Sequence, residues 1–418
     1  MRICVAGAGI VGLTTAYALA RRGHDVTVVD AGSGPGQGTS GANGGQLSYS
    51  YVAPLADPSI WKNLPSYLLH PDSPLTFRPK LDLKQWRWCL QFLMACNAKA
   101  SARATAALLR LAFFSRDCLA ALQGELALDF DFRQAGKLVM VSTPAGLKAA
   151  SAQVEFQRSL GCEQEVLDAK RCMEIEPALA PSAARWLGGV YTASEQVGDC
   201  AAFCGQLAAR LARSVGTVRF VFNTAIAGAH VERQRLVALS SSAGDIAADH
   251  FILANGCGSA RLAAALGFTL PVYPLKGYSV TLAAGAGCGL PSVSITDVAN
   301  KIVYARLGKR LRVAGMLEIV GHDLSVDARR CAKLAAQAGT LFPGISHDIA
   351  DMSPWAGARP ATPTGLPVVG RGPLTNLSLN VGHGALGWTL ACGSAELLAA
   401  QIEGRPSPIG DQTAFQFV

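Results

Sequence analysis

Several features that would indicate a special class of protein are scarce or missing in this sequence. Charged residues make up only 16% of the 418 residues and aromatic residues 7%. The chain has no internal repeat, no low-complexity linker and no Cys-x-x-Cys pair, and its closest cysteines, Cys200 and Cys204, lack neighbouring histidines or cysteines at metal-site spacing. These absences argue against a repeat protein and a zinc module, and they predict no metal site.

Runs of like charge are missing as well. The net charge is +8, but the 37 basic residues are scattered, which is typical of a solvated basic surface and predicts no nucleic-acid partner. The twelve cysteines stand mostly among small or apolar residues, where a thiol behaves as a small hydrophobic group. A reducing cytoplasm is therefore expected. The length and the 50% hydrophobic content predict two or three globular domains.

Only one long hydrophobic run is present, and it lies at the start of the chain. The eighteen residues between Arg2 and Arg21 carry no charge, as in a signal peptide or a membrane helix. Three glycines, Gly7, Gly9 and Gly12, lie near its middle, and each weakens a helix by about 1 kcal/mol relative to alanine. The run is better explained as strand 3–5, a glycine turn, helix 11–21 and strand 26–30.

This unit predicts a dinucleotide site. In Gly-x-Gly-x-x-Gly the first glycine permits the tight turn, the second lets backbone amides approach a pyrophosphate, and the third allows close packing of helix on strand. The helix N-terminus adds free donors and a partial positive charge. Asp30 follows Gly12 by eighteen residues and is expected to accept hydrogen bonds from the ribose. The predicted adenosine and pyrophosphate contacts are Gly7, Gly9, Ile10, Val11, Gly12, Asp30 and Ala31.

The rest of the chain alternates helical and strand patterns. Helices are expected near 83–97, 101–125, 199–213 and 388–402, and strands near 217–222, 251–254 and within 272–320. A nucleotide-binding pattern at both ends encloses a strand-rich middle. We therefore predict an α/β fold with two discontinuous domains. A Rossmann-like dinucleotide-binding domain comprises 1–47, 193–266 and 356–418, and a mixed-sheet α+β substrate domain comprises 48–192 and 267–355.

A second glycine-rich segment identifies the dinucleotide. Residues 38–46, with Thr39, Ser40, Asn43, Gly45 and Gln46, resemble the flavin-contacting loop of the FAD-dependent amine-oxidising family that includes glycine oxidase, D-amino acid oxidase and bacterial D-amino acid dehydrogenases. The stretches YPLKGYS (273–279), RPATPTGLPVVGR (359–371) and NVGHGALGWTLACGS (380–394) resemble the dehydrogenase branch, nearly end to end. The resemblance implies FAD, bound non-covalently because residues 353–370 contain no cysteine.

The resemblance also implies which further residues meet the cofactor. Ile226 would face the adenine, and Ala254 and Gly256 would end the strand beneath FAD. The C-terminal loop and the following helix start would present backbone amides to the flavin pyrimidine. These last contacts are Gly382, His383, Gly384, Leu386, Gly387, Trp388 and Thr389.

The substrate site follows from the same resemblance. Arg359 stands in a Gly-x-Arg-Pro element whose arginine holds the substrate carboxylate in the family, and a guanidinium suits this task because it makes two parallel charge-assisted hydrogen bonds. Tyr278 is the next candidate, with Tyr51, Tyr304 and Tyr49 as alternatives for a pocket hydroxyl or wall. No residue is predicted as a catalytic acid or base, because the flavin carries the hydride chemistry.

The predicted activity is oxidation of small neutral D-amino acids, namely D-alanine, D-proline or hydroxy-D-proline, with electrons passed to a quinone or respiratory acceptor. A glycine- or sarcosine-type oxidase and a flavin electron-transfer subunit are the alternatives, and an oligomer or partner subunit is compatible with each.

Segment 60–95 is the candidate for peripheral contact with the cytoplasmic face of the inner membrane, the alternative being a helix packed on its own core. Its aromatic, apolar and basic residues are Trp61, Lys62, Tyr67, Leu68, Leu69, Lys80, Lys84, Trp86, Arg87, Trp88, Phe92 and Leu93.

Overall fold

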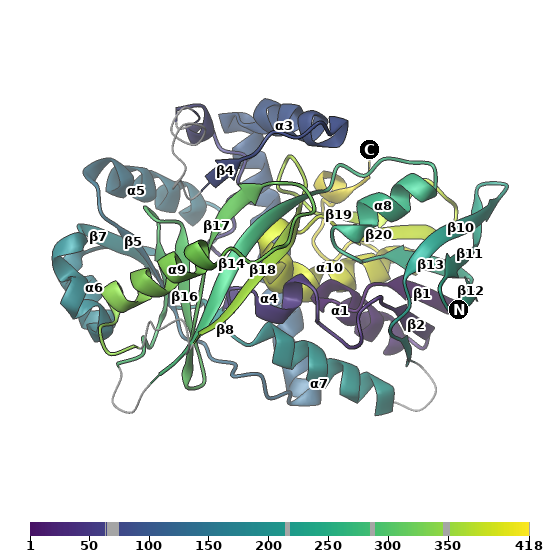
Figure 1. Cartoon of the computed structure of the whole chain (residues 1–418), viewed down its shortest axis with the longest axis horizontal. Coiled ribbons are helices and arrows are strands. Elements are labelled where there is room, and N and C mark those ends of the chain that lie inside the picture. The colour runs from purple at the N-terminus through teal and green to yellow at the C-terminus, as the bar shows by residue number, and fades with distance from the viewer. Residues whose placement is uncertain (63, 65–74, 214–217, 285–288, 346–351, 418) are drawn as a thin grey trace.

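The structure is a computed structural model that describes residues 1–62, 64, 75–213, 218–284, 289–345 and 352–417. Figure 1 shows two sheets side by side, one around the N-terminus and one in the opposite half of the molecule. The hydrophobic start of the chain forms strand β1 (Arg2–Ala6), helix α1 (Ile10–Ala20) and strand β2 (Asp25–Val29). This confirms the predicted strand–turn–helix–strand unit.

The first sheet carries this unit. In the described part of the chain its six strands follow the order β19 (Val368–Arg371), β20 (Leu377–Val381), β13 (His250–Leu253), β1, β2 and β9 (Val218–Val221). All neighbouring pairs are parallel except β19 with β20. Parallel strands are buried on both faces, which explains the apolar runs seen in the sequence.

Helices and a small sheet cover the two faces of the first sheet. One face packs against α1, α4 (Ala98–Leu126), α7 (Cys200–Arg213) and α10 (Gly387–Ile402). The other packs against α8 (Gly258–Ala265) and a small antiparallel sheet of β10 (Ile226–Glu232), β11 (Arg235–Ser241) and β12 (Gly244–Ala247). The carboxyl end of β1 leads directly into the start of α1, the position at which doubly wound sheets bind a ligand.

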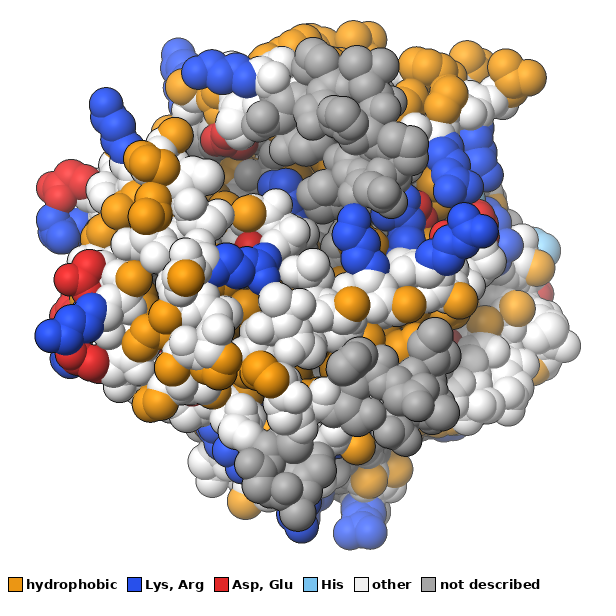
Figure 2. Space-filling model, turned by 60° about the vertical axis from the view of Figure 1, so that its left-hand side comes forward, with side chains coloured by type: hydrophobic (Ala, Val, Ile, Leu, Met, Phe, Trp, Pro, Cys, Tyr) orange, Lys and Arg blue, Asp and Glu red, His pale blue; other side chains and the backbone are white. Residues whose placement is uncertain are grey.

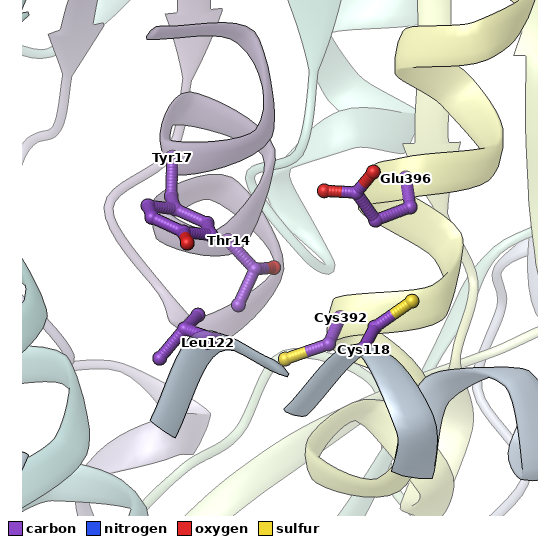
Figure 3. A pocket seen from close by; sticks show the side chains of 6 residues that line it. All are labelled: Thr14, Tyr17, Cys118, Leu122, Cys392 and Glu396. Carbon is purple, nitrogen blue, oxygen red and sulfur yellow. The ribbon is translucent and has the colours of Figure 1, made fainter. Parts of the chain in front are cut away.

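Small residues let α1, α4 and α10 approach closely. The Thr14 hydroxyl donates to the Ala391 carbonyl oxygen across 3.1 Å, and a Cβ at Gly393 would lie 2.8 Å from the Ser115 Cβ. The crevice left between the three helices measures about 10 Å³, and Figure 3 shows the residues that line it, among them Cys118 and Cys392. This volume is that of about one water, so the contact is a packed core.

The second sheet fills the other half of the molecule. Among the described residues its main path is β18 (Met352–Ala361), β14 (Tyr273–Ala283), β17 (Arg310–Ile319), β16 (Ile302–Leu307), β15 (Ser294–Asp297), β5 (Lys137–Val141), β7 (Gly188–Thr192) and β6 (Glu165–Asp168), and β4 (Leu75–Phe77) pairs with β17. Helix α9 (Ala328–Leu341) covers one face. The outer elements are α3 (Leu83–Ala95), α5 (Pro144–Arg158), α6 (Ala169–Ile175) and the 3₁₀ segment η2 (Pro177–Arg185).

Short elements connect the two halves. Strands β3 (Gln46–Leu47) and β8 (Gln196–Val197) pair with each other, and η1 (Thr39–Ala42) and η4 (Gly384–Leu386) are single 3₁₀ turns between larger elements. The C-terminal turn η5 (Thr413–Phe415) packs beside β19.

The division of the chain differs from the predicted one at two places. Helix α4 was expected in the substrate domain, but its buried Leu108, Leu111 and Leu119 pack in the same core as α1 and α10. Strand β18 was split by the predicted boundary at residue 356, yet it runs unbroken to Ala361 and pairs along its length with β14. Helical periodicity shows that a face is buried, whereas the partner of that face is a tertiary property.

Candidate active site

The turn between β1 and α1 has no room for side chains. Gly7 adopts φ +112°, and a Cβ there would lie 2.6 Å from the carbonyl oxygen of Ala254. A Cβ at Gly12 would lie 1.9 Å from the carbonyl oxygen of Gly7. Gly9 is the N-cap of α1 and offers no capping side chain, and the first turn holds no acidic residue. The amide donors of this helix start therefore suit a pyrophosphate.

Asp30 lies at the end of β2, beside this turn. Its carboxylate accepts hydrogen bonds from the amides of Ala8 and Gly32, each at 2.7 Å. These bonds fix the carboxylate, and because each oxygen has two lone pairs, acceptor capacity remains for ribose hydroxyls. The amide of Thr224 donates to the Asp30 carbonyl oxygen, which brings the half-buried Ile226 at the start of β10 close to the same strand end.

The predicted hydroxyl residues of the flavin loop connect this turn to the second sheet. The Ser40 hydroxyl oxygen accepts from the Ile10 amide at 3.0 Å, so Ser40 lies against the N-terminus of α1. The Thr39 hydroxyl donates to the Ala358 carbonyl oxygen in β18 at 2.6 Å. The loop therefore spans from the predicted pyrophosphate site to the strand that carries Arg359.

The next residues of the flavin loop, Asn43 and Gly45, pack against the second sheet. The Asn43 side chain accepts a hydrogen bond from the Gly45 amide at 2.9 Å. The backbone carbonyl oxygen of Asn43 accepts a hydrogen bond from the Arg312 guanidinium at 2.7 Å. Gly45 has φ +68°, and a Cβ there would lie 3.2 Å from Leu307. Glycine is thus needed both for the turn and for close packing on β16.

Lys137 of β5, which the sequence prediction missed, holds the end of the flavin loop by hydrogen bonds. Its side chain is buried, and its ammonium donates to the Gln46 amide oxygen at 2.7 Å and to the Ser48 hydroxyl at 2.8 Å. The same ammonium lies 4.5 Å from the ring centre of Tyr51, whose side chain is exposed. Burial lowers the pKa of Lys137, and the buried Glu195 opposes that shift. A single lysine opening an otherwise apolar strand was the signal available in the sequence.

Glu195 fixes the next part of the same segment. Its carboxylate accepts from the amides of Tyr49 and Ser50 at 2.8 and 2.7 Å. The Tyr49 hydroxyl donates to Gln196, so this alternative pocket candidate is held inside the protein.

The C-terminal loop meets this assembly from the other side. Gly382 and Gly384 have φ +81° and +55°, and His383 between them pairs with Ala361 at the end of β18. The His383 ring is buried beside the Ser394 hydroxyl, and burial lowers its pKa to about 3. A histidine that binds a proton so weakly is a poor general base, in line with the prediction that His383 acts through its backbone.

The start of α10 is fixed against the flavin loop. Thr389 accepts from the Ser48 amide at 3.1 Å. The Trp388 indole donates to the Gly198 carbonyl oxygen within an aromatic cluster that includes Phe130 and Phe203, so its side chain faces the core. Only the backbone of this helix start is left to face a cofactor.

Arg359 is a partly buried cation near the end of β18. Its half-buried guanidinium donates to the Met316 carbonyl oxygen at 3.0 Å, and no acidic side chain among the described residues pairs with it. Burial lowers its pKa to about 10. The guanidinium lies over Gly277, where a Cβ would be 2.4 to 2.5 Å from its atoms. A partly desolvated guanidinium with unused donors is a site for an anion.

Met316 shapes this site through its backbone. It has φ +60° in the middle of β17, where the pairing with β14 shifts register between Lys276 and Tyr278. Such a conformation costs about 1–3 kcal/mol in a non-glycine residue and is characteristic of functional sites. Here it coincides with the carbonyl oxygen that accepts from Arg359.

Two of the predicted tyrosines lie elsewhere. The Tyr278 hydroxyl donates to Glu318 at 2.6 Å, beside Lys276, and the ring packs among residues of α9. The Tyr304 ring is fully buried against Phe342. Strand alternation places Tyr278 on the opposite face of β14 from the glycine beneath Arg359. The structure thus places Tyr278 and Tyr304 on the face of the second sheet that α9 covers, and Tyr51 on the side of the flavin loop.

Comparison with known proteins gives this arrangement its family. The family model described as DAO, FAD dependent oxidoreductase, matches residues 2–401. The chain belongs to this family. The residues of the glycine turn, Asp30 and the flavin loop fit its FAD, and this oxidoreductase is thus a flavin-dependent enzyme. In the described part of the chain, no group of three or more His, Cys, Asp or Glu side chains is placed to hold a metal ion.

Individual relatives cover nearly the whole oxidoreductase. It is 48% identical to D-amino acid dehydrogenase 2 of Ralstonia nicotianae, over 98% of each chain, and 50% identical to D-amino acid dehydrogenase 2 of Pseudomonas aeruginosa, over 98% of this chain and 96% of that one. The glycine oxidase structure from Geobacillus kaustophilus superimposes with a TM-score of 0.78 at 23% identity, covering 100% of this chain and 98% of that one. The predicted fold class is confirmed.

Proposed function

We propose that this flavoenzyme oxidises small neutral D-amino acids, of the size of D-alanine, D-proline or hydroxy-D-proline, and acts as a dehydrogenase. The observation that carries the proposal is Arg359, a half-buried guanidinium without an acidic partner among the described residues, one residue from the carbonyl oxygen bound by Thr39 of the flavin loop. The names of the two relatives near 50% identity support the D-configuration and the dehydrogenase activity.

The residues of the site would act by binding and orientation. Arg359 binds the substrate carboxylate through two parallel hydrogen bonds and fixes which face of Cα is presented. FAD, when bound, accepts the hydride. The substrate enters this step with a neutral amine, and the resulting imine is hydrolysed by water to a 2-oxo acid and ammonia when the amine is primary. His383, held neutral by burial, supplies no proton in this scheme.

Anaerobic reduction of the bound flavin tests the proposal. We expect D-alanine, D-proline or cis-4-hydroxy-D-proline to bleach the visible flavin absorbance, and L-alanine to leave it unchanged. Bleaching by sarcosine or L-alanine alone would favour the amine oxidase alternative. Bleaching by none of these compounds would favour an electron-transfer subunit. Reoxidation of the reduced enzyme by a soluble quinone should be faster than by oxygen if the acceptor is respiratory.

The proposed acceptor implies contact with a membrane, and α3 offers a surface for it. Leu83, Trp86, Leu90 and Met94 recur at helical spacing and are 87%, 49%, 61% and 71% exposed. An apolar stripe on a helix with basic neighbours is typical of interfacial binding. Figure 2 shows hydrophobic side chains with Lys and Arg side chains near the upper edge, where α3 lies in Figure 1. Further exposed residues around the stripe are Trp61, Lys62, Lys80, Leu81, Lys84 and Arg87.

The inner side of α3 packs on the protein core, which is what the alternative prediction for segment 60–95 describes. Trp88 and Phe92 are buried and stack on each other, next to Tyr273 of β14. Tyr67, Leu68 and Leu69 of the predicted membrane segment lie outside the described residues. No helix in the described ranges is long and apolar enough to span a bilayer. The proposal is therefore a peripheral contact through the outer stripe of α3.

Vesicle sedimentation tests this contact. The double variant Leu83→Glu/Leu90→Glu should lower the fraction of protein that pellets with anionic phosphatidylglycerol vesicles at low salt by at least about fivefold. It removes apolar side chains that would be buried in the lipid and adds negative charge that the anionic lipid repels. Phe156→Glu on α5, which changes another exposed hydrophobic residue, is the matched control. Equal pelleting of all three proteins, or no pelleting of the wild type, would rule out α3 as a membrane surface.

A further inference from the structure

The floor of the carboxylate site consists of two glycines on neighbouring strands. Gly277 of β14 and Gly357 of β18 are directly paired in the antiparallel register. Their missing side chains would point to the same face as Arg359, because Arg359 follows Gly357 by two residues in the strand. The pair carries no side chains of its own on this face, and larger side chains of β18 extend over it.

Two side chains lie on this floor. The guanidinium of Arg359 covers Gly277, and the indole of Trp355 covers Gly357, where a Cβ would be 1.9 to 2.7 Å from three carbons of the six-membered ring. The Cβ positions of directly paired residues are about 4.5–5.5 Å apart. The indole and the guanidinium are thus neighbours, and Trp355 is only half-buried.

The surroundings place this floor between the cofactor loop and α3. On one side the Ser279 hydroxyl donates to the Ala42 carbonyl oxygen at 2.7 Å, which brings the flavin loop against the sheet. On the other side Leu275 packs with Trp88 of α3, whose indole donates to the Ala361 carbonyl oxygen. The Trp355 ring therefore lies beside the guanidinium that would bind a ligand carboxylate.

We propose that Trp355 is the wall of the substrate pocket and that it selects apolar or ring-shaped side chains, such as the pyrrolidine ring of D-proline. This proposal rests on the proposed function of Arg359 as the carboxylate anchor. A flat aromatic face removes the ring methylenes of the substrate from water, whereas D-alanine offers it a single methyl group. When two substrates differ by one methylene that enters an apolar pocket, their kcat/KM values differ by about tenfold or more.

Binding measurements on the unreduced holoenzyme test the wall directly. Pyrrole-2-carboxylate offers a carboxylate and a flat ring, and acetate offers the carboxylate alone; their dissociation constants are measured from the change in flavin absorbance. Trp355→Leu should raise the dissociation constant of pyrrole-2-carboxylate by at least about tenfold and that of acetate by less than about threefold. Trp355→Phe should retain most of the affinity for both compounds. Trp86→Leu, which changes an exposed tryptophan of α3, is the matched control.

Steady-state kinetics give the second readout. The ratio of kcat/KM for D-proline to that for D-alanine should fall by at least about tenfold in Trp355→Leu and recover in Trp355→Phe. Equal weakening of acetate and pyrrole-2-carboxylate, or no change in either, would overturn the proposal. If neither amino acid reduces the wild-type flavin, the proposed function fails, yet the two dissociation constants still decide the role of Trp355.

Discussion

Replacing Arg359 with leucine should lower kcat/KM for D-alanine by about 100-fold or more, chiefly through KM. Hydrogen bonds to a charged group contribute about 1.5–3 kcal/mol each, and a bidentate carboxylate loses two of them. Steady-state kinetics with the flavin-loaded variant provide the measurement. Arg359→Lys, which keeps the charge but loses the planar fork, should fall between the wild type and the leucine variant.

The stability of the same variant separates binding from folding. Arg359 is partly desolvated and lacks an acidic partner among the described residues, so leucine at this position should leave the free energy of unfolding of the substrate-free protein unchanged or slightly increased. Thermal unfolding of the two holoenzymes checks this. If the variant has the predicted stability but an unchanged KM, then Arg359 does not bind the substrate.

The second large effect concerns the cofactor. Gly12→Ala should abolish stable FAD binding, because its Cβ would lie 1.9 Å from the Gly7 carbonyl oxygen and would displace α1 from the turn that approaches the pyrophosphate. The ratio of flavin to protein absorbance after purification, and titration of the apoprotein with FAD, provide the measurements.

A helical glycine with free space is the matched control for this variant. Gly205 lies in α7 and a Cβ there meets no atom within 4 Å. Gly205→Ala should keep its full flavin content and gain up to about 1 kcal/mol in the free energy of unfolding. Full flavin content in Gly12→Ala as well would show that the turn does not limit FAD binding.

Local sequence patterns predicted those parts of the site in which neighbouring residues act together. The Gly7 to Gly12 turn, its flanking strands and Asp30 are one continuous unit, so spacing alone located it. Arg359 is the predicted anchor because the short Gly-x-Arg-Pro element around it resembles that of the family. In both cases the chemistry depends on residues that are close in the chain.

The remaining parts depend on contacts that no local pattern contains. Tyr278 lies one residue from Gly277, and only strand pairing shows that the two residues face opposite sides of the sheet. Lys137 and Gln46 are far apart in sequence, and their hydrogen bond follows from the packing of β5 against the flavin loop. The indole of Trp355 gains its place from Gly357 beneath it, which a sequence pattern cannot distinguish from an ordinary turn glycine.

Strand β18 joins both cofactor loops to the proposed substrate anchor. The carbonyl oxygen of Ala358 is held by Thr39 from one cofactor loop, and Ala361 pairs with His383 from the other. Arg359 stands between these two attachments, so we expect ordering of the loops by FAD to order the proposed substrate anchor as well. By linkage, whatever affinity FAD adds for the amino acid, the amino acid adds for FAD. Substrate should therefore slow the loss of cofactor from the enzyme, and the apoprotein should be a poor receptor for amino acids.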